Sequence, residues 1–221
     1  MTIPKYANTD INTSEGDPNT HGRRSPSQSP LSILIVGVGG QGTLLASRIL
    51  AGVALRTGYD VKVSEIHGMA QRGGSVVTQV RFGTAVASPI ITRGQADIIL
   101  AFEKLEALRW LPYAKKAGTI LYNTQSINPM PVITGAAVYP ADADAQIQAA
   151  FPEAVPIEAL ALARTCGTPK AVNVVLLGLL SRFLSIEENV WKETLRETVP
   201  SRFLDINMAA FQVGRTYRNE A

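Results

Sequence analysis

The stretch Ile33-Leu-Ile-Val-Gly-Val-Gly-Gly-Gln-Gly-Thr43 decides the fold that we predict for this chain. Four apolar residues, three of them β-branched, lead into a cluster of glycines, and apolar residues at helical spacing follow from Thr43 to Leu50. This order of apolar run, glycine cluster and amphipathic run predicts a strand, a tight turn and a helix.

The glycines of this turn have a spacing that is used to bind phosphate groups. Gly37, Gly39 and Gly42 fit the pattern G-x-G-x-x-G, and Gly40 is an additional glycine. The first permits the bend, the second lets another group approach the backbone, and the third lets the helix pack against the strand. Because unpaired N–H groups at the helix start favour an anion, a ligand site is one interpretation. The other is a turn that only connects a strand to a helix.

A dinucleotide site requires an acidic residue as well, which binds the ribose about 20 residues further along, at the end of the second strand. The second strand is predicted over residues 61–66, and Glu65 lies near its end, 28 positions after Gly37. Dinucleotide binding is therefore permitted by the glycine spacing but is not favoured.

The composition excludes several classes of protein. Of the 221 residues, 46% are hydrophobic and 18% are charged, and the net charge is +3. No run of Lys and Arg is interleaved with aromatic residues, so nucleic-acid binding is not expected. The longest apolar run near the end of the chain, residues 174–180, is far below the ~18 residues that span a bilayer, so no membrane segment is expected. A single cysteine, Cys166, is typical of a cytoplasmic protein.

The chain divides into a tail and one domain. Residues 1–30 are rich in Pro, Asn, Ser and Thr, which predicts a flexible N-terminal tail, or alternatively one that becomes ordered across a partner subunit. Residues 31–221 alternate strand and helix patterns and predict a single α/β domain with an open, Rossmann-like, mainly parallel sheet, an antiparallel hairpin and a helical C-terminal part. Further strands are expected at 75–82, between Gly83 and Pro89, at 97–102 and at 119–122, and further helices at 103–116, 141–151, 157–165, 170–183, 187–199 and 202–218.

Two more groups of residues are candidates for a site. In the loop His67-Gly-Met-Ala-Gln-Arg-Gly-Gly74, Arg72 can make a bidentate contact with a carboxylate or phosphate, and His67 can exchange protons near neutral pH. The alternative is a connecting loop whose His and Arg satisfy backbone carbonyls. Asn123 follows a predicted strand, at the carboxyl edge where open α/β sheets bind ligands. Glu103 and Lys104 are expected to form a solvated helix start.

The chain lacks the residues that most cofactors need. Its only histidines are His21, in the tail, and His67, so no metal site is expected. Four-cysteine ligation of an iron–sulfur cluster is impossible with one cysteine, and no P-loop or nucleophile elbow is present. We therefore assign no catalytic residue and expect no cofactor to be bound by this chain alone.

Three segments together resemble a known family. Gly37-Val-Gly-Gly-Gln-Gly42, Ser64-Glu-Ile-His-Gly-Met-Ala-Gln-Arg-Gly-Gly-Ser75 and Ala101-Phe-Glu-Lys-Leu-Glu-Ala107 are similar to the gamma-type domain of 2-oxoacid:ferredoxin oxidoreductases. Within that family the chain looks most like the beta subunit of the indolepyruvate-oxidising enzymes. The resemblance extends from about Leu31 to the C-terminus and leaves out the tail.

The resemblance implies an accessory subunit of a heteromeric enzyme. In this family a larger subunit holds thiamine diphosphate, Mg²⁺ and iron–sulfur clusters, decarboxylates a 2-oxoacid and transfers the acyl group to coenzyme A, while a ferredoxin-like carrier receives the electrons. Indolepyruvate is the first candidate substrate, and phenylpyruvate, phenylglyoxylate and branched-chain oxoacids remain open.

We expect the glycine turn and the loop after the second strand to face one crevice, at the subunit interface or on the approach of coenzyme A. Two rival functions remain, a stand-alone NAD(P)-dependent oxidoreductase and a non-catalytic scaffold or regulatory module. The residues assigned to the crevice are Gly37, Gly39, Gly40, Gln41, Gly42, Glu65, His67, Gln71, Arg72, Gly73, Gly74 and Asn123.

Overall fold

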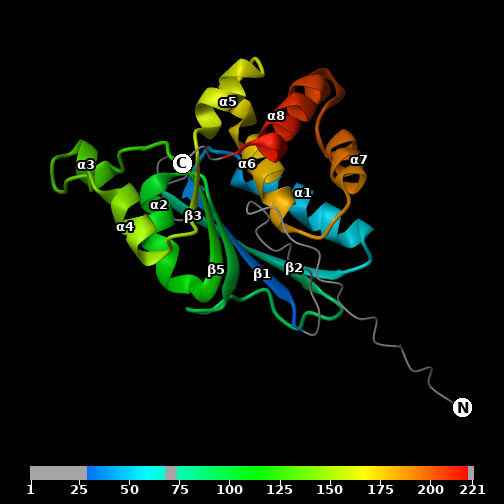
Figure 1. The fold of residues 1–221 in the computed structure, drawn as a ribbon, viewed down its shortest axis with the longest axis horizontal. Helices are drawn as coiled ribbons and strands as arrows, with labels where there is room; N and C mark the ends of the chain where they lie inside the picture. Colours follow the sequence, from blue (N-terminus) through cyan, green and yellow to red (C-terminus); the bar gives the residue numbers. More distant parts are fainter. Residues whose placement is uncertain (1–28, 68–73, 219–221) are drawn as a thin grey trace, which may run out of the picture.

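A six-stranded sheet in the order β2-β3-β1-β4-β5-β6 forms the centre of the molecule (Figure 1). The computed structural model describes residues 29–67 and 74–218. Strands β1, β4, β5 and β6 are parallel, and β3 runs antiparallel to both β1 and β2, which confirms the predicted parallel sheet with an antiparallel hairpin. The strands are β1 (Leu31–Val38), β2 (Asp60–His67), β3 (Ser75–Gly83), β4 (Ala96–Ala101), β5 (Ala114–Asn123) and β6 (Val155–Ile157).

Helices cover both faces of the sheet (Figure 1). One face carries α1 and the C-terminal helices, and the other carries α2 and α4. The helices are α1 (Thr43–Arg56), α2 (Lys104–Trp110), α3 (Met130–Ile133), α4 (Ala143–Ala150), α5 (Ala159–Thr165), α6 (Val172–Leu180), α7 (Glu188–Thr198) and α8 (Leu204–Thr216), with short 3₁₀ turns η1 (Leu111–Tyr113), η2 (Pro169–Ala171), η3 (Ser181–Phe183) and η4 (Ser201–Phe203).

Burial on both faces of the sheet explains the apolar run Ile33–Val36 of β1. Ile33 and Ile35 pack into the larger core cluster, beneath α1 and α6, whereas Leu34 and Val36 pack into the smaller cluster beneath α2. Alternate side chains of a strand point to opposite faces, so a run that is covered on both faces is apolar on both. All eight residues of β1 are buried.

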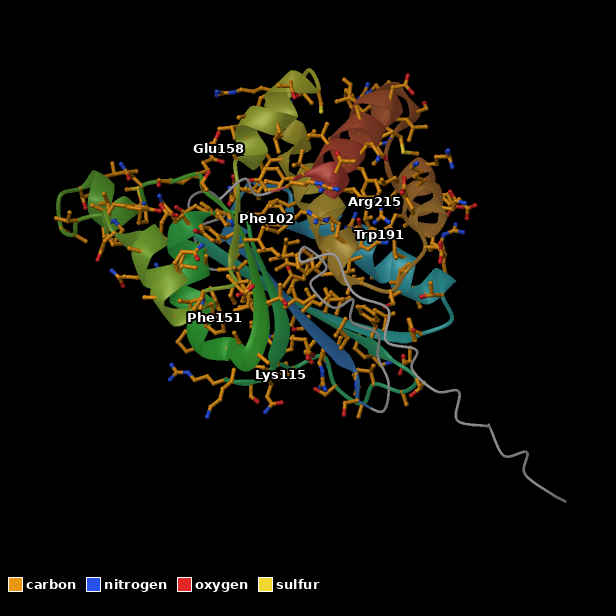
Figure 2. The ribbon with its side chains drawn as sticks, viewed as in Figure 1. Phe102, Lys115, Phe151, Glu158, Trp191 and Arg215 are labelled. Carbon is orange, nitrogen blue, oxygen red and sulfur yellow. The ribbon has the colours of Figure 1, made fainter. Side chains whose placement is uncertain are left out.

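Helix α6 is the most buried helix, as its composition predicts, and none of its nine residues is exposed. It packs against α8, and Trp191 of α7 and Phe211 of α8 stack beside it with ring centroids 5.8 Å apart (Figure 2). In the described ranges 29–67 and 74–218, no helix is both long and apolar enough to cross a membrane.

Three predicted elements are wrong in detail. The helix expected over 103–116 ends at Trp110, because Pro112 cannot continue it, and β5 begins at Ala114. No strand lies between Gly83 and Ala96 in the described structure. The helix expected from Ile157 is preceded by a strand that the prediction missed, β6. The predicted tail lies outside the described residues, apart from positions 29 and 30.

Candidate functional site

The glycine turn between β1 and α1 leaves two of its glycines almost no room for a side chain. A Cβ on Gly37 would lie 2.9 Å from Cβ of Phe102, and one on Gly42 would lie 2.7 Å from Nδ2 of Asn173. Gly42 also has a φ of +81°, in the left-handed region that favours glycine. The first and third glycines of the motif are therefore required by packing, whatever lies above the turn.

Gln41 is held by the backbone on both sides of the turn. Its Oε1 accepts a hydrogen bond of 2.7 Å from the Val38 N–H, and its Nε2 donates one of 2.9 Å to the Phe102 carbonyl. The side chain therefore connects the end of β1 to the residue that follows β4. This fixes the floor of the predicted crevice.

The end of the loop after β2 lies beside the glycine turn. The Gly39 N–H donates a 2.9 Å hydrogen bond to the Gly74 carbonyl, so two of the predicted segments meet at this point. His67 is the last residue of β2, and its backbone lies opposite Val76. The His67 side chain and the predicted site residues Gln71, Arg72 and Gly73 lie outside what the structure describes.

Glu65 contacts helix α1 and lies on a strand that is not adjacent to β1. Its Oε1 accepts a 3.0 Å hydrogen bond from the Ser47 hydroxyl of α1, and β3 separates its strand from β1. In a dinucleotide-binding fold the strand that carries the ribose-binding acid is the direct neighbour of the first strand. The position of Glu65 therefore gives no support to dinucleotide binding.

Asn123 is buried at the carboxyl end of β5, with an exposed fraction of 1%. Its Nδ2 donates a hydrogen bond of 3.1 Å to the Phe102 carbonyl oxygen, which also accepts the hydrogen bond from Gln41. Its Oδ1 accepts a hydrogen bond of 3.2 Å from the Ala159 N–H. The amide thereby connects the ends of β4 and β5 with the start of α5, and it is not among the residues that line the cavity described next.

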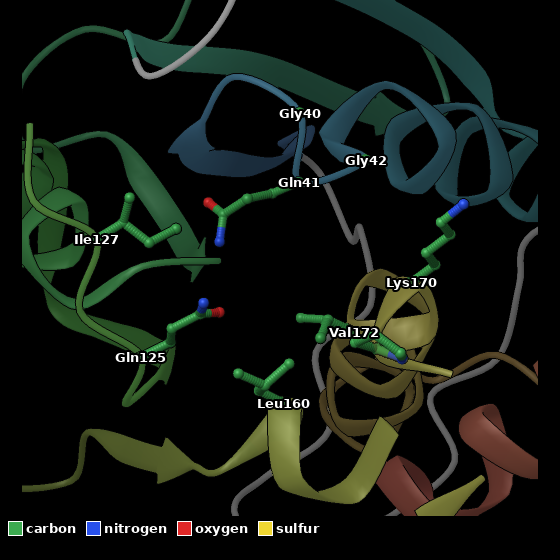
Figure 3. A pocket seen from close by; sticks show the side chains of 9 residues that line it. Gly40, Gln41, Gly42, Gln125, Ile127, Leu160, Lys170 and Val172 are labelled. Atoms are coloured by element: carbon green, nitrogen blue, oxygen red, sulfur yellow. The ribbon is translucent and has the colours of Figure 1, made fainter. Parts of the chain in front are cut away.

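A cavity of about 470 Å³ opens above the glycine turn (Figure 3). Its volume lies within the range of small-molecule sites. The turn forms one wall, and the segment after β5 and the start of α5 and α6 form the others. The lining residues are Gly40, Gln41, Gly42, Gln125, Ile127, Leu160, Pro169, Lys170 and Val172.

The lining favours an anionic ligand that has an apolar part. Lys170 is the one charged lining residue, and its side chain extends toward α1 in Figure 3. Helix α1 has no acidic residue in its first turn, so the positive end of its dipole is not neutralised there. Ile127, Leu160 and Val172 supply apolar walls. Phosphate-bearing molecules with an organic body have this character.

Glu103 is buried, with an exposed fraction of 1%, so the predicted solvated helix start is wrong. Its Oε2 accepts a hydrogen bond of 2.9 Å from the Glu106 N–H and thereby caps α2. Its Oε1 accepts two hydrogen bonds, one of 3.0 Å from the Ile127 N–H and one of 2.6 Å from the Tyr139 hydroxyl. Burial, and then the hydrogen bond to Glu103, raise the pKa of the Tyr139 phenol well above its usual range, so that it stays a donor.

Glu106 on α2 anchors the start of β3. Its Oε2 accepts a 2.5 Å hydrogen bond from the Ser75 hydroxyl, and its Oε1 accepts a 3.1 Å hydrogen bond from Nε of Arg109. Together with the Gly39–Gly74 bond, this contact fixes the chain where it re-enters the sheet. Among the described residues, no group of three His, Cys, Asp or Glu side chains is arranged to bind a metal.

Residues 32–217 match the family model of pyruvate ferredoxin/flavodoxin oxidoreductase. The chain belongs to this family. It is 43% identical to the indolepyruvate oxidoreductase subunit IorB of Thermococcus kodakarensis, over 83% of this chain and 93% of that protein. It is 26% identical to the ketoisovalerate oxidoreductase subunit VorA of Methanothermobacter thermautotrophicus, over 88% of this chain and 38% of that protein.

The fold of this family member is also found in a solved structure. Pyruvate oxidoreductase subunit PORC from Thermotoga maritima matches with a TM-score of 0.64 and 19% identity, over 84% of this chain and 94% of that one. The predicted family resemblance, fold class and class of oxidoreductase subunit are thus confirmed.

Several of the residues that line the cavity were not predicted from the sequence. Lys170 lies in η2, Val172 is the first residue of α6 and Leu160 lies on α5, all far from the glycine turn in sequence. One signal was available, because Lys170 follows Pro169 at the start of a predicted apolar helix, but nothing in the sequence placed that helix end above the turn. Glu103 likewise looked like an ordinary first-turn glutamate.

Proposed function

We propose that this chain is the accessory, gamma-type subunit of a cytoplasmic, thiamine diphosphate-dependent 2-oxoacid oxidoreductase. The enzyme would decarboxylate indolepyruvate or a related aryl 2-oxoacid oxidatively, transfer the acyl group to coenzyme A and pass electrons to ferredoxin or a similar carrier. The observation that supports this substrate class is the 43% identity to an indolepyruvate oxidoreductase subunit over 93% of its length. The match to the ketoisovalerate subunit is weaker and spans 38% of that chain.

In this proposal the larger partner subunit holds thiamine diphosphate, Mg²⁺ and the iron–sulfur clusters. Thiamine diphosphate supplies the carbanion chemistry of decarboxylation. The contribution of this chain is to bind and orient: the glycine turn and Lys170 would receive the phosphate groups of coenzyme A, and the apolar cavity walls would contact its organic body. Arg72, in the loop that re-enters the sheet at Gly74, would add a contact at the same crevice.

The two rival functions have less support. A stand-alone NAD(P)-dependent enzyme needs an acid on the strand next to the first one, whereas Glu65 lies on β2, which β3 separates from β1, and it accepts a hydrogen bond from Ser47 of α1. A non-catalytic scaffold would not need a cavity whose one charged lining residue is a lysine.

The first prediction tests the assignment itself. When the chain is co-expressed with the larger subunit, the two are expected to purify as one complex that reduces a ferredoxin in the presence of indolepyruvate and coenzyme A. The measurement is the ratio of kcat/KM for indolepyruvate to that for ketoisovalerate, and we expect the ratio to exceed 10. A ratio below one would contradict the aryl substrate class, and a chain that never joins the complex would contradict the subunit role.

The second prediction concerns Lys170. Lys170→Gln removes the positive charge from the cavity while leaving a side chain of similar length, so the KM for coenzyme A should rise about tenfold, as for one charge-assisted contact near a surface. The matched control is Lys116→Gln, an exposed lysine at the amino end of β5, beside Lys115 at the far end of the sheet in Figure 2. An unchanged KM in Lys170→Gln, or an equal rise in Lys116→Gln, would contradict the proposed role of the cavity.

A further inference from the structure

The segment of residues 124–141, here called the arm, leaves the sheet after β5 and returns at α4. It contains α3, which projects beyond the sheet at one extremity of the molecule, away from the C-terminal helices (Figure 1). No charged residue occurs from Ala117 to Ala141, although 18% of the chain is charged. The arm is therefore an exposed segment without a solubilising charge.

Large apolar side chains are concentrated on the arm. Met130, Ile133 and Val138 have exposed fractions of 58%, 65% and 92%. Scattered apolar residues on a surface need no explanation, but a contiguous group marks an interaction surface. Depletion of charge is also typical of the buried centre of a protein interface.

The shape of the arm is fixed from within the fold. Oε1 of Glu103 accepts one hydrogen bond from the Ile127 N–H near the start of the arm and another from the Tyr139 hydroxyl near its end. One atom of a buried side chain therefore holds the two ends of the arm together. Inside the arm, the Ala137 N–H donates a hydrogen bond of 3.0 Å to the Pro131 carbonyl, and the chain turns at Gly135, which has a φ of +76°. A surface that is already ordered loses little conformational entropy when it is covered.

We propose that the arm is a docking surface that inserts its apolar tip into an uncharged, apolar face of the larger subunit. This rests on the proposed function, because that function supplies the partner. The arm is not a ligand site but an element of assembly, and Ile133 and Val138 are its principal contacts.

Two observations favour the larger subunit as the occupant. The base of the arm is also a wall of the cavity, through Gln125 and Ile127, so a protein that closes the crevice from outside meets the arm as well. In addition, the match to VorA covers only 38% of that chain, so in that relative the corresponding domain is joined to a much longer polypeptide.

A second copy of this chain is a less suitable occupant. Helix α3 has four residues, and two arms that meet tip to tip cover far less than the roughly 800 Å² per partner that a stable dimer needs. A partner that covers both the arm and the crevice buries a larger continuous surface. The charge-free tip also matches an apolar face better than the charged surface of the other elements.

The test measures assembly of full-length chain variants with the purified, cofactor-loaded larger subunit. Ile133→Asp and Val138→Asp place a charge at the tip, and each is expected to raise the dissociation constant at least tenfold, the scale of a residue at an interface centre. The matched control is Leu55→Asp on α1, which has an exposed fraction of 60% and lies outside the arm. Its dissociation constant should stay within twofold of wild type.

Melting curves of each full-length variant alone verify folding, and Ile133→Ser provides a milder change at the same position. The arm proposal is overturned if the wild-type chain binds the larger subunit and the arm variants bind equally well, or if Leu55→Asp weakens binding as much. It is also overturned if the isolated chain is a dimer that the arm variants dissociate. If the wild-type chain does not bind the larger subunit, both this proposal and the proposed function fail.

Discussion

Replacing Gly178 or Gly214 with alanine is expected to destabilise the chain by about 3 kcal/mol or more, among the largest effects of any single methyl group in this fold. Helices α6 and α8 meet backbone to backbone at these glycines. A Cβ on Gly214 would lie 1.9 Å from the Val175 carbonyl oxygen, and one on Gly178 would lie 2.1 Å from the Phe211 carbonyl oxygen. Since the obstacle is backbone, no rotamer change relieves it, and the two helices must separate.

The measurement is urea unfolding of the full-length chain, in which the urea concentration at the unfolding midpoint should fall strongly in both variants. The matched control is Gly52→Ala combined with Thr194→Ser. Gly52 is also a glycine within a helix that packs against another helix. A Cβ there would meet only the Thr194 methyl group, at 2.8 Å, and Thr194→Ser removes that methyl group. The control should be neutral or slightly stabilised, because alanine favours helix over glycine by roughly 1 kcal/mol. A loss below about 1 kcal/mol in both test variants would refute the close helix contact.

The sequence predicts the first strand, turn and helix well because each is specified by local rules. The apolar run of β1 requires burial on both faces, and Gly42 at φ +81° occupies a conformation that few other residues tolerate. The same holds for the helix of residues 172–180, whose apolar composition leaves it no exposed face. These elements need no information about distant parts of the chain.

The parts that were missed depend on contacts between distant residues. Strand β6 has three residues, one of them proline, and it exists because β5 offers an edge, so no local pattern reveals it. Lys170 is a cavity residue only because α6 packs behind the glycine turn, where Asn173 donates to the Gly42 carbonyl across 131 positions. Pairings of that separation are decided by the tertiary fold.

Glu103 illustrates the same limit within the site. A glutamate before a helix is ordinarily a solvated cap, and its first role here, accepting from the Glu106 N–H, is that local one. The second role requires residues 127 and 139 to converge on its other oxygen. That convergence depends on the path of the arm, which sequence spacing does not predict.

Glu103→Ala is accordingly expected to cost about 3 kcal/mol of unfolding free energy and to release the arm. Three donors, the N–H groups of Glu106 and Ile127 and the hydroxyl of Tyr139, lose an acceptor at 2.6–3.0 Å. A buried donor left without a partner costs roughly 1–3 kcal/mol, and the partly exposed Tyr139 can recover part of this from water. The pKa of the Tyr139 phenol should fall toward its ordinary value, because the hydrogen bond to Glu103 and the negative charge of Glu103 both raise it and both are removed, while burial remains.

The matched control is Tyr139→Phe, which removes one of the three donors and leaves the carboxylate bonded to the other two. It also removes the acceptor of the Leu105 N–H at 3.1 Å, so it should cost about 2 kcal/mol, as two hydrogen bonds do, and still less than Glu103→Ala. Chemical unfolding of both variants gives the comparison, and amide hydrogen exchange over residues 124–141 shows whether the arm has opened. Because Ile127 lines the cavity and Tyr139 ends the arm, Glu103→Ala should also weaken both coenzyme A binding and assembly with the larger subunit. Equal costs for the two variants, with unchanged exchange in the arm, would mean that Glu103 only caps α2 and that the arm is held by its own internal contacts.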